Sequence, residues 1–292
     1  MTNKCLTLAV HGGAGPLRGR DYGREQVHMR GLIEAGRDRL AAGASALDVV
    51  VETVAALEAA GLYVAGRGAS PNSDGRYELD AALMDGATQR AGAVAALEGF
   101  ASPIRAALAV MRETPHVLLA GAGAAEFAQG QGLAPIADPR AWFTHAGGGG
   151  AGKAASDLAI GTVGCVARDG TGALAAATST AGVFGKLPGR VGDSPIPGAG
   201  VWADGRVAVS CTGTGEMFMR AAVAAQIAFR LRFAGEDLAA ACASALADVK
   251  ALGGEGGLIA IGADGEIAMP YISAGMKRAA LYADGTITCE VF

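Results

Sequence analysis

The sequence predicts an α+β fold in which helices cover layered, mainly antiparallel sheets. Helical segments fall in groups between groups of short apolar strands, instead of alternating strictly with them as in a parallel βαβ protein. The 292 residues are 51% hydrophobic, which is enough for a large buried core and excludes a disordered chain. The 46 glycines have no three-residue period and accompany only 10 prolines, so a collagen-like fibre is excluded as well.

The first half begins with a short strand and two helices. We expect a buried strand at residues 6–10, ended by the sequence HGGAG at residues 11–15. Helices are expected over residues 24–42 and 46–60, separated by Gly43 to Ser45, and apolar residues recur with helical spacing in the second of them. Further elements are expected as strands at residues 77–84, 93–97 and 117–120, and helices at residues 104–111 and 124–129.

Ser102 and Pro103 predict how the helix at residues 104–111 begins. Serine favours the N-cap position and proline the first helical position, where its missing N–H is not needed. The second half should contain strands at residues 162–168, 173–178, 207–211, 258–261, 266–269 and 286–291, with helices at residues 217–229 and 236–251.

A segment of small residues separates the two halves. Residues 146–155 spell AGGGGAGKAA, with five glycines and no large side chain. Such a composition predicts a flexible linker, which we place at residues 146–161.

Charge and cysteine content exclude several classes of protein. The net charge of −4 disfavours a generally basic nucleic-acid binder. The five cysteines are scattered without a CxxC pair, which disfavours a disulfide framework or a zinc site. The apolar run before the first glycines is too short for a secretory or membrane-spanning segment. We therefore expect a cytoplasmic protein with no nucleic-acid and no membrane partner.

Two glycine motifs approach nucleotide-binding patterns without completing them. Gly147 to Lys153 has the spacing of a phosphate loop, but Ala154 lacks the hydroxyl that would hold Mg²⁺. Gly121 and Gly123 follow an expected strand, but Glu126 stands where a dinucleotide fingerprint has its third glycine. Neither motif predicts a nucleotide site.

Thr162 is the residue from which chemistry can be argued directly. It opens an apolar strand just after the glycine-rich segment, and a threonine in that place is by itself ordinary. If the chain were cut between Gly161 and Thr162, Thr162 would gain an α-amino group with a pKa near ~8. That amine can take the proton of the Thr162 hydroxyl, so one residue would act as both nucleophile and base.

Six unusual motifs carry a resemblance to a known family. They are HGGAG at 11–15, ELDAALMDG at 78–86, GTVG at 161–164, ATSTAG at 177–182, LPGRVGDSPIPGAG at 187–200 and SCTGTGE at 210–216. Through them the chain resembles, over essentially its whole length, the plant-type asparaginase and isoaspartyl peptidase family of N-terminal nucleophile hydrolases. The resemblance implies a four-layer αββα sandwich forming one domain over residues 1–292. It also implies self-cleavage into an α chain (1–161) and a β chain (162–292).

The resemblance assigns the catalytic roles to residues of the second half. Thr162 is the nucleophile, and Thr180 tunes its hydroxyl through hydrogen bonding. The Thr212 hydroxyl and the Gly213 N–H form the oxyanion hole, in which one donor contributes about 3 kcal/mol to the transition state.

Substrate binding is assigned by the same resemblance to one short loop and a neighbour. Arg190 binds the α-carboxylate of an aspartyl group through the parallel N–H donors of its planar guanidinium. Asp193 pairs with the α-ammonium, helped by the Gly215 carbonyl. A zwitterionic amino-acid head needs one cation and one anion at fixed separation, and residues 190–193 supply both.

The resemblance further implies a structural ion but no cofactor for catalysis. The segment LEAAGLYVAGRG at residues 57–68 would hold a Na⁺-like ion through backbone carbonyls, which suit a hard cation. The expected carbonyl ligands are Leu57, Glu58, Ala60, Tyr63 and Ala65.

Three positions depart from the family pattern. Val64 stands where asparagine is common, and Ile160 stands where histidine is frequent. Residues 183–185 replace a more polar run and are expected to border the leaving group, where Phe184 either favours a larger or apolar leaving group or fills space between layers.

The implied activity is hydrolysis of β-aspartyl amide bonds in isoaspartyl dipeptides and L-asparagine, through a β-aspartyl ester on Thr162. The implied assembly is a homodimer of αβ units. One alternative is a glycosylasparaginase, which shares much of the 189–193 motif. A second alternative, of another class, is an uncleaved, non-catalytic protein that binds a metabolite or nucleotide, since Val64 and Ile160 depart from the pattern.

Overall fold

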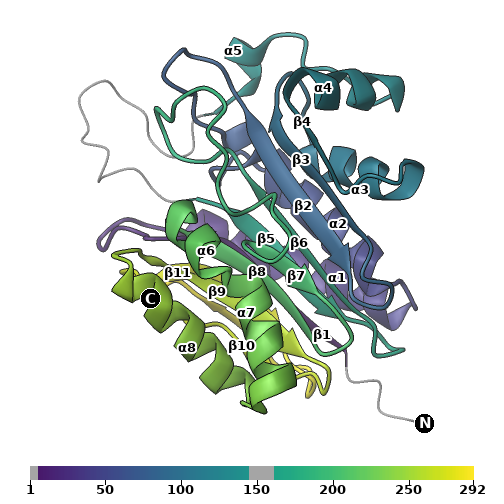
Figure 1. Ribbon diagram of the computed structural model, residues 1–292, viewed down its shortest axis with the longest axis vertical. Coiled ribbons are helices and arrows are strands. Elements are labelled where there is room, and N and C mark those ends of the chain that lie inside the picture. The colour runs from purple at the N-terminus through teal and green to yellow at the C-terminus, as the bar shows by residue number, and fades with distance from the viewer. Residues whose placement is uncertain (1–5, 145–160) are drawn as a thin grey trace.

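Two β-sheets stack face to face between two layers of helices (Figure 1), in a computed structural model that describes residues 6–144 and 161–292. A buried apolar layer formed by residues of both sheets, such as Ala176 of one and Ile259 of the other, joins them. The four-layer αββα sandwich that the resemblance implied is confirmed.

The larger sheet interleaves strands from both halves of the chain. Its order is β12-β11-β1-β5-β6-β2-β3-β4, and all neighbours are antiparallel except β3 and β4. Its strands are β1 (Thr7–Ala14), β2 (Leu79–Asp85), β3 (Ala91–Leu97), β4 (Leu118–Ala120), β5 (Val163–Arg168), β6 (Leu174–Thr180), β11 (Met276–Leu281) and β12 (Ile287–Glu290). Because β5 and β6 lie between β1 and β2, a cut before Thr162 would leave both fragments hydrogen-bonded within one sheet.

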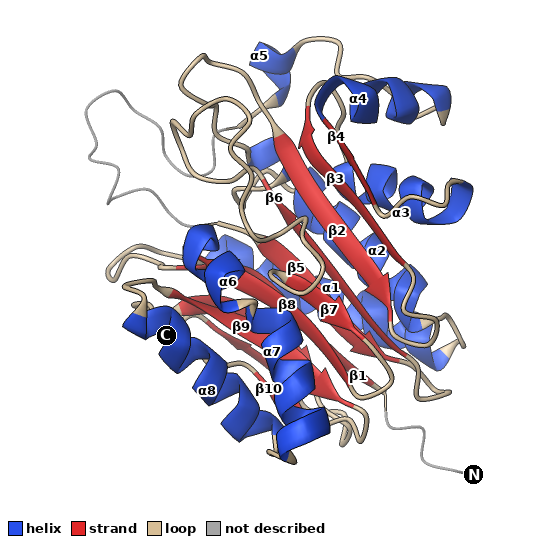
Figure 2. Cartoon of the chain, viewed as in Figure 1, coloured by secondary structure: helices blue, strands red, loops and turns tan. Residues whose placement is uncertain are grey.

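The smaller sheet has the order β10-β9-β8-β7 and comes entirely from the second half. Its strands are β7 (Val201–Ala203), β8 (Val207–Gly213), β9 (Gly256–Gly262) and β10 (Ile267–Ala268). Figure 2 shows helices on its outer face and on the outer face of the larger sheet. Each sheet therefore buries one face against helices and the other against its partner sheet.

The helices divide between the two outer layers in chain order. The larger sheet is covered by α1 (Gly23–Ala41), α2 (Ala46–Ala59), α3 (Pro103–Glu113) and α4 (Gly121–Gly130). The smaller sheet is covered by α6 (Gly215–Ala221), α7 (Val223–Phe229) and α8 (Leu238–Ala251). Three short helices complete the described residues: η1 (Gly66–Gly68), α5 (Pro139–Trp142) and the π-helix η3 (Arg230–Ala234).

Most expected elements are confirmed, and the errors have local physical causes. The strand predicted to end at Val10 continues to Ala14, because pairing with β5 and β11 supplies hydrogen bonds to the HGGAG segment. The helix predicted over residues 217–229 is broken at Ala222, whose φ of 47° is left-handed. The strand β11 was not predicted, since the charged Lys277 and Arg278 interrupt its apolar pattern.

The start of α3 is confirmed in position but not in its cap. Pro103 is the first helical residue, yet the Ser102 side chain makes no capping hydrogen bond. Instead Ser102 Oγ donates to Glu58, and Glu58 Oε1 accepts from the N–H of Ile104 at 3.0 Å. A buried carboxylate from α2 therefore satisfies the helix terminus.

Several predictions concern residues outside the described ranges. The proposed linker at 146–161 falls there apart from Gly161, as do Ile160 and the phosphate-loop-like residues. Within the described residues, no helix has the length and apolarity needed to cross a bilayer.

Candidate active site

One small cleft gathers most of the predicted catalytic and substrate-binding residues where β5, β6 and β8 meet. Thr162 immediately precedes β5, Thr180 ends β6 and Gly213 ends β8. The cleft is lined by Thr162, Thr180, Gly182, Val183, Arg190, Gly192, Asp193, Ser194, Gly213 and Gly215. The predicted residues Thr212 and Phe184 do not line it.

The two threonines form a buried hydrogen-bonded pair. Thr162 Oγ1 donates to Thr180 Oγ1 at 3.2 Å, and both side chains are almost completely buried. Thr180 Oγ1 also accepts from the Gly182 N–H at 3.0 Å, which fixes its orientation. The predicted partnership of Thr180 with Thr162 is therefore present in the folded chain.

The residue before Thr162 has room only for glycine. A Cβ on Gly161 would lie 2.5 Å from Val64 Cγ2, and such a contact cannot be accommodated without displacing the neighbouring segment. The Val64 carbonyl accepts from the Ala181 N–H at 3.0 Å, so Val64 ties the strand that carries Thr180 to the Gly161–Thr162 bond. The position where asparagine is common thus packs directly on the bond predicted to break.

Arg190 is held at the edge of the cleft by a carboxylate. Its Nε and Nη2 contact Glu216 Oε1 at 2.9 and 2.8 Å. Burial would raise the pKa of Glu216, but the hydrogen bond and charge of Arg190 outweigh it and lower that pKa. Glu216 thus anchors one edge of the guanidinium, which has five N–H donors in all, and the remaining donors can bind an anion.

Asp193 presents a buried carboxylate with one oxygen that has no hydrogen-bond partner among the described residues. Asp193 is 3% exposed, and that oxygen is Oδ2. Burial raises the pKa of Asp193 to about 7, against the opposing effects of a backbone hydrogen bond and of Arg190. Leaving a buried carboxylate unpaired is costly, so the site suits a cationic ligand. Gly215 permits close approach, since a Cβ there would lie 2.9 Å from Asp193 Oδ1.

Thr212 and Gly213 occupy the end of β8 beside the cleft. The N–H of Ala14, from the HGGAG segment, donates to Thr212 Oγ1 at 3.3 Å. Gly213 has a φ of 157°, and a Cβ there would lie 2.4 Å from the Glu255 carbonyl oxygen. Glycine is therefore required where β8 approaches the start of β9 this closely.

The predicted ion-binding segment forms the connection between α2 and η1. The Tyr63 carbonyl accepts from the Ala65 N–H at 2.8 Å, and the Ala65 carbonyl accepts from the Gly68 N–H at 3.1 Å. Each of these oxygens retains a second lone pair, so both fit the neutral ligands that a hard monovalent ion prefers. No cluster of three or more acidic, histidine or cysteine side chains suited to a metal occurs in the described ranges.

Two contributors to the site were not predicted. Glu216 belongs to the SCTGTGE motif, but its pairing with Arg190 joins residues 26 apart and has no local signal. Lys186, which begins the informative run KLPGRVGDSPIPGAG at residues 186–200 but has no predicted role in the site, is almost fully buried behind the cleft. Its burial could not be expected from a lysine in a loop rich in glycine and proline.

A four-layer αββα sandwich with a buried threonine at the start of an inner strand is the architecture of the N-terminal nucleophile hydrolases. Comparisons with known proteins agree with this class. A family model described as "Asparaginase" matches residues 4–148 and 147–291. The chain belongs to this asparaginase family.

Curated relatives cover almost the full chain. An isoaspartyl peptidase of Salmonella typhimurium is 45% identical over 99% of this chain and 99% of its own length. A plant-type L-asparaginase of Pyrobaculum calidifontis is 44% identical over 93% of this chain and 95% of its own. A human isoaspartyl peptidase/L-asparaginase is 38% identical over 94% of this chain and 92% of its own.

Proposed function

We propose that this protein hydrolyses the β-amide bond of aspartyl units, in isoaspartyl dipeptides and in L-asparagine, with Thr162 as nucleophile. The names of its relatives support this activity. The observation that carries it is the unpartnered Asp193 carboxylate beside Arg190, in the cleft that contains Thr162. A buried anion and a fixed cation suit the ammonium and carboxylate of an amino-acid head.

The proposal includes activation by self-cleavage. The Thr162 hydroxyl attacks the Gly161 carbonyl carbon, and the peptide bond is exchanged for an ester as the Thr162 nitrogen leaves. Water then hydrolyses the ester, which frees a Gly161 carboxylate and the Thr162 α-amine. With a pKa near ~8, a sizeable fraction of that amine is neutral at physiological pH and can act as a base.

Hydrolysis of substrate then follows the same chemistry. Arg190 binds the α-carboxylate and Asp193 binds the α-ammonium, which places the side-chain amide carbon beside Thr162 Oγ1. The Thr162 amine accepts the hydroxyl proton and later donates it to the leaving amine. The negative oxygen of the intermediate is stabilised by the Gly213 N–H and the Thr212 hydroxyl. Water releases aspartate from the ester on Thr162.

A comparison of three substrates tests the proposal. Purified protein is assayed with a β-aspartyl dipeptide, L-asparagine and an N4-glycosyl-asparagine, and release of the amine or ammonia is measured. We expect turnover of the first two and little of the third. Preference for the glycosylated substrate would establish the glycosylasparaginase alternative, and absence of all turnover would contradict the proposal.

Two further parts of the proposal rest on family membership. We propose a structural Na⁺ ion at the carbonyls of the segment that joins α2 to η1, and a homodimer of αβ units. Replacing Na⁺ by choline should lower the thermal unfolding midpoint if the ion is bound, and an unchanged midpoint would contradict it. Sedimentation should give twice the mass of one chain, and a monomer would contradict the assembly.

A further inference from the structure

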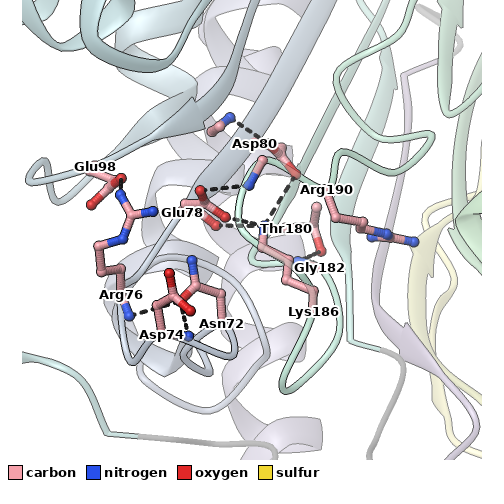
Figure 3. A network of polar contacts seen from close by, with 12 residues as sticks. Asn72, Asp74, Arg76, Glu78, Asp80, Glu98, Thr180, Gly182, Lys186 and Arg190 are labelled. Atoms are coloured by element: carbon pink, nitrogen blue, oxygen red, sulfur yellow. Dashed lines mark hydrogen bonds and ion pairs between the residues drawn. The ribbon is translucent and has the colours of Figure 1, made fainter.

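A buried ionic cluster, none of whose side chains takes part in the steps of the proposed reaction, lies behind the cleft (Figure 3). It consists of Lys186, Glu78 and Asp80, whose side chains are 1%, 4% and 0% exposed, and we refer to it as the Lys186 cluster. Lys186 Nζ lies 3.9 Å from Glu78 Oε2 and 4.0 Å from Asp80 Oδ2, and it donates to the Glu78 carbonyl oxygen at 3.0 Å.

Stability alone does not explain this cluster. Two carboxylates face one ammonium, and Glu78 Oε2 and Asp80 Oδ2 have no hydrogen-bond partner among the residues described. Burial raises the pKa of Asp80 although Lys186 opposes it, and burial lowers the pKa of Lys186 although Asp80 opposes it. Buried ion pairs of this kind often contribute less to stability than apolar residues of the same volume.

The cluster is connected to the loop that carries Arg190. Glu78 Oε1 accepts from the N–H of Gly189, the residue just before Arg190, at 2.8 Å. The Lys186 carbonyl accepts from the Ser73 N–H at 2.8 Å, so the start of the same loop is attached to the segment before β2. The Glu78 side chain and the Lys186 main chain therefore fix the loop at both ends, and the Lys186 side chain adds its hydrogen bond to the Glu78 carbonyl oxygen.

Lys186 also acts on the Arg190 guanidinium through its charge. A Cβ on Gly182 would lie 3.3 Å from both Lys186 Nζ and Arg190 Nη1, so both cations lie close to Gly182, and in addition to burial the charge of Arg190 contributes to lowering the pKa of Lys186. Like charges repel strongly where water is excluded. Glu78 and Asp80 attract Lys186 from one side, while Glu216 attracts Arg190 from the other. The guanidinium is thereby held away from Lys186 and at the cleft.

We propose that the Lys186 cluster positions Arg190 for the substrate α-carboxylate, and so sets substrate affinity more than the rate of the chemical step. The inference rests on the proposed function, since it concerns the same cleft. Glu78 and Asp80 lie before the proposed cleavage site and Lys186 lies after it. The cluster therefore joins the two fragments at the point where substrate is bound.

Lys186→Met tests the cluster by removing the ammonium while keeping a long side chain. We expect KM for L-asparagine to rise about tenfold with kcat changed less than about twofold, as for loss of uniform binding. The inhibition constant of L-aspartate should rise with KM, whereas that of β-alanine, which lacks the α-carboxylate, should stay unchanged. Self-cleavage needs no α-carboxylate and should remain complete by intact mass.

Two companion variants make the test decisive. Glu78→Gln keeps an acceptor for the Gly189 N–H but removes a charge, and we expect a smaller rise in KM with the same selectivity for L-aspartate over β-alanine. If Lys186→Met does not fold, Glu78→Gln alone tests whether the cluster positions Arg190. Lys250→Met, at an exposed lysine of α8, is the matched control and should change nothing.

An unchanged KM in folded Lys186→Met and Glu78→Gln would overturn the inference. An equal rise of both inhibition constants would also overturn it, because general damage does not depend on the α-carboxylate. Failure of the wild-type protein to hydrolyse either substrate would refute the proposed function instead. In that case calorimetric affinities for L-aspartate and β-alanine still decide whether the cluster positions Arg190.

Discussion

Two polar regions lie side by side between the sheets, and they differ in whether their side-chain oxygen atoms are hydrogen-bonded, although His11 Nδ1 in the second region also lacks a partner among the described residues. Just before the start of β5, Thr162 opens onto the cleft, where Asp193 Oδ2 lacks a hydrogen-bond partner among the described residues. Gly164 lies two positions after Thr162 and faces the same side of the strand. Next to it, hydrogen-bonded side chains fill the space between the sheets, and we call them the closed network. There His11 Nε2 lies 2.9 Å from Ser210 Oγ, which lies 2.7 Å from Thr178 Oγ1.

The closed network explains why β5 has a glycine at position 164. A Cβ there would lie 1.9 Å from Ser210 Oγ and 2.4 Å from His11 Nε2. Burial lowers the pKa of His11 to about 3, against the opposing effect of a polar contact with the Thr162 backbone and with a smaller lowering by the charge of Lys277, so the imidazole is neutral at physiological pH. The network therefore joins the two sheets without introducing a charge.

The difference between the closed network and the cleft shows which polar groups serve stability and which serve ligand binding. In the closed network each hydroxyl is paired within the protein, which favours the folded state. At the cleft a buried carboxylate is left for a ligand, which lowers stability and supplies binding energy. Substitutions in the two regions should therefore have opposite effects on folding and activity.

The largest effect is expected at the nucleophile on the cleft side. Thr162→Ala removes the hydroxyl needed for both self-cleavage and hydrolysis, so the chain should stay uncut and lose activity by at least about 10³-fold. Electrophoresis and steady-state kinetics measure both. Thr162→Ser, which keeps a hydroxyl, is the control and should be cut, and an active alanine variant would exclude Thr162 as nucleophile.

Asp193→Asn should separate activity from stability. We expect kcat/KM to fall about 100-fold, because the substrate ammonium loses its charged partner. The free energy of unfolding should rise by about 1–3 kcal/mol, since an unpaired buried charge is removed. Steady-state kinetics measure kcat/KM and denaturant titration measures the free energy of unfolding. A variant that loses both activity and stability would contradict the proposed difference between the cleft and the closed network.

Ligand affinity should depend on pH through Asp193. Because its pKa is raised to about 7, the carboxyl becomes protonated as the pH falls below that value and ceases to attract an ammonium. As the pH is lowered from 7 to 5, the dissociation constant of L-aspartate should therefore rise about tenfold for each pH unit. Calorimetry at a series of pH values measures this. Asp193→Asn should bind weakly with no such slope, and an equal slope in that variant would assign the titration to another group.

The smallest effect on activity is expected in the closed network. Ser210→Ala leaves His11 and Thr178 without their shared partner, and the free energy of unfolding should fall by about 1–3 kcal/mol. Because this residue does not line the cleft, kcat/KM should change less than about threefold. A large loss of activity without a loss of stability would show that the network serves catalysis.

Local patterns predicted most elements because apolar periodicity is a local property. The helix α2 and the position of Pro103 at the start of α3 followed directly from such patterns. The left-handed Ala222 did not, because alanine carries no local signal for that conformation. The strand β11 was missed because its buried charges are matched by distant residues, such as Glu290 for Arg278.

The site was predicted only in part. Thr162, Arg190 and Asp193 came from motifs within the second half, and the structure brings them to one cleft. The Lys186 cluster and the His11–Ser210 contact could not be predicted in this way. They join residues 108 and 199 positions apart, and a single sequence does not indicate which distant polar side chains share a buried site.

The central claim is that cleavage before Thr162 creates the active enzyme, and intact mass measurement of the purified wild-type protein tests it most directly. We predict two fragments, residues 1–161 and 162–292, whose masses sum to one chain plus one water. The new fragment should begin with Thr162 and should stay associated with the other, because β5 and β6 lie between β1 and β2. A single uncut chain that hydrolyses L-asparagine or a β-aspartyl dipeptide would contradict the account.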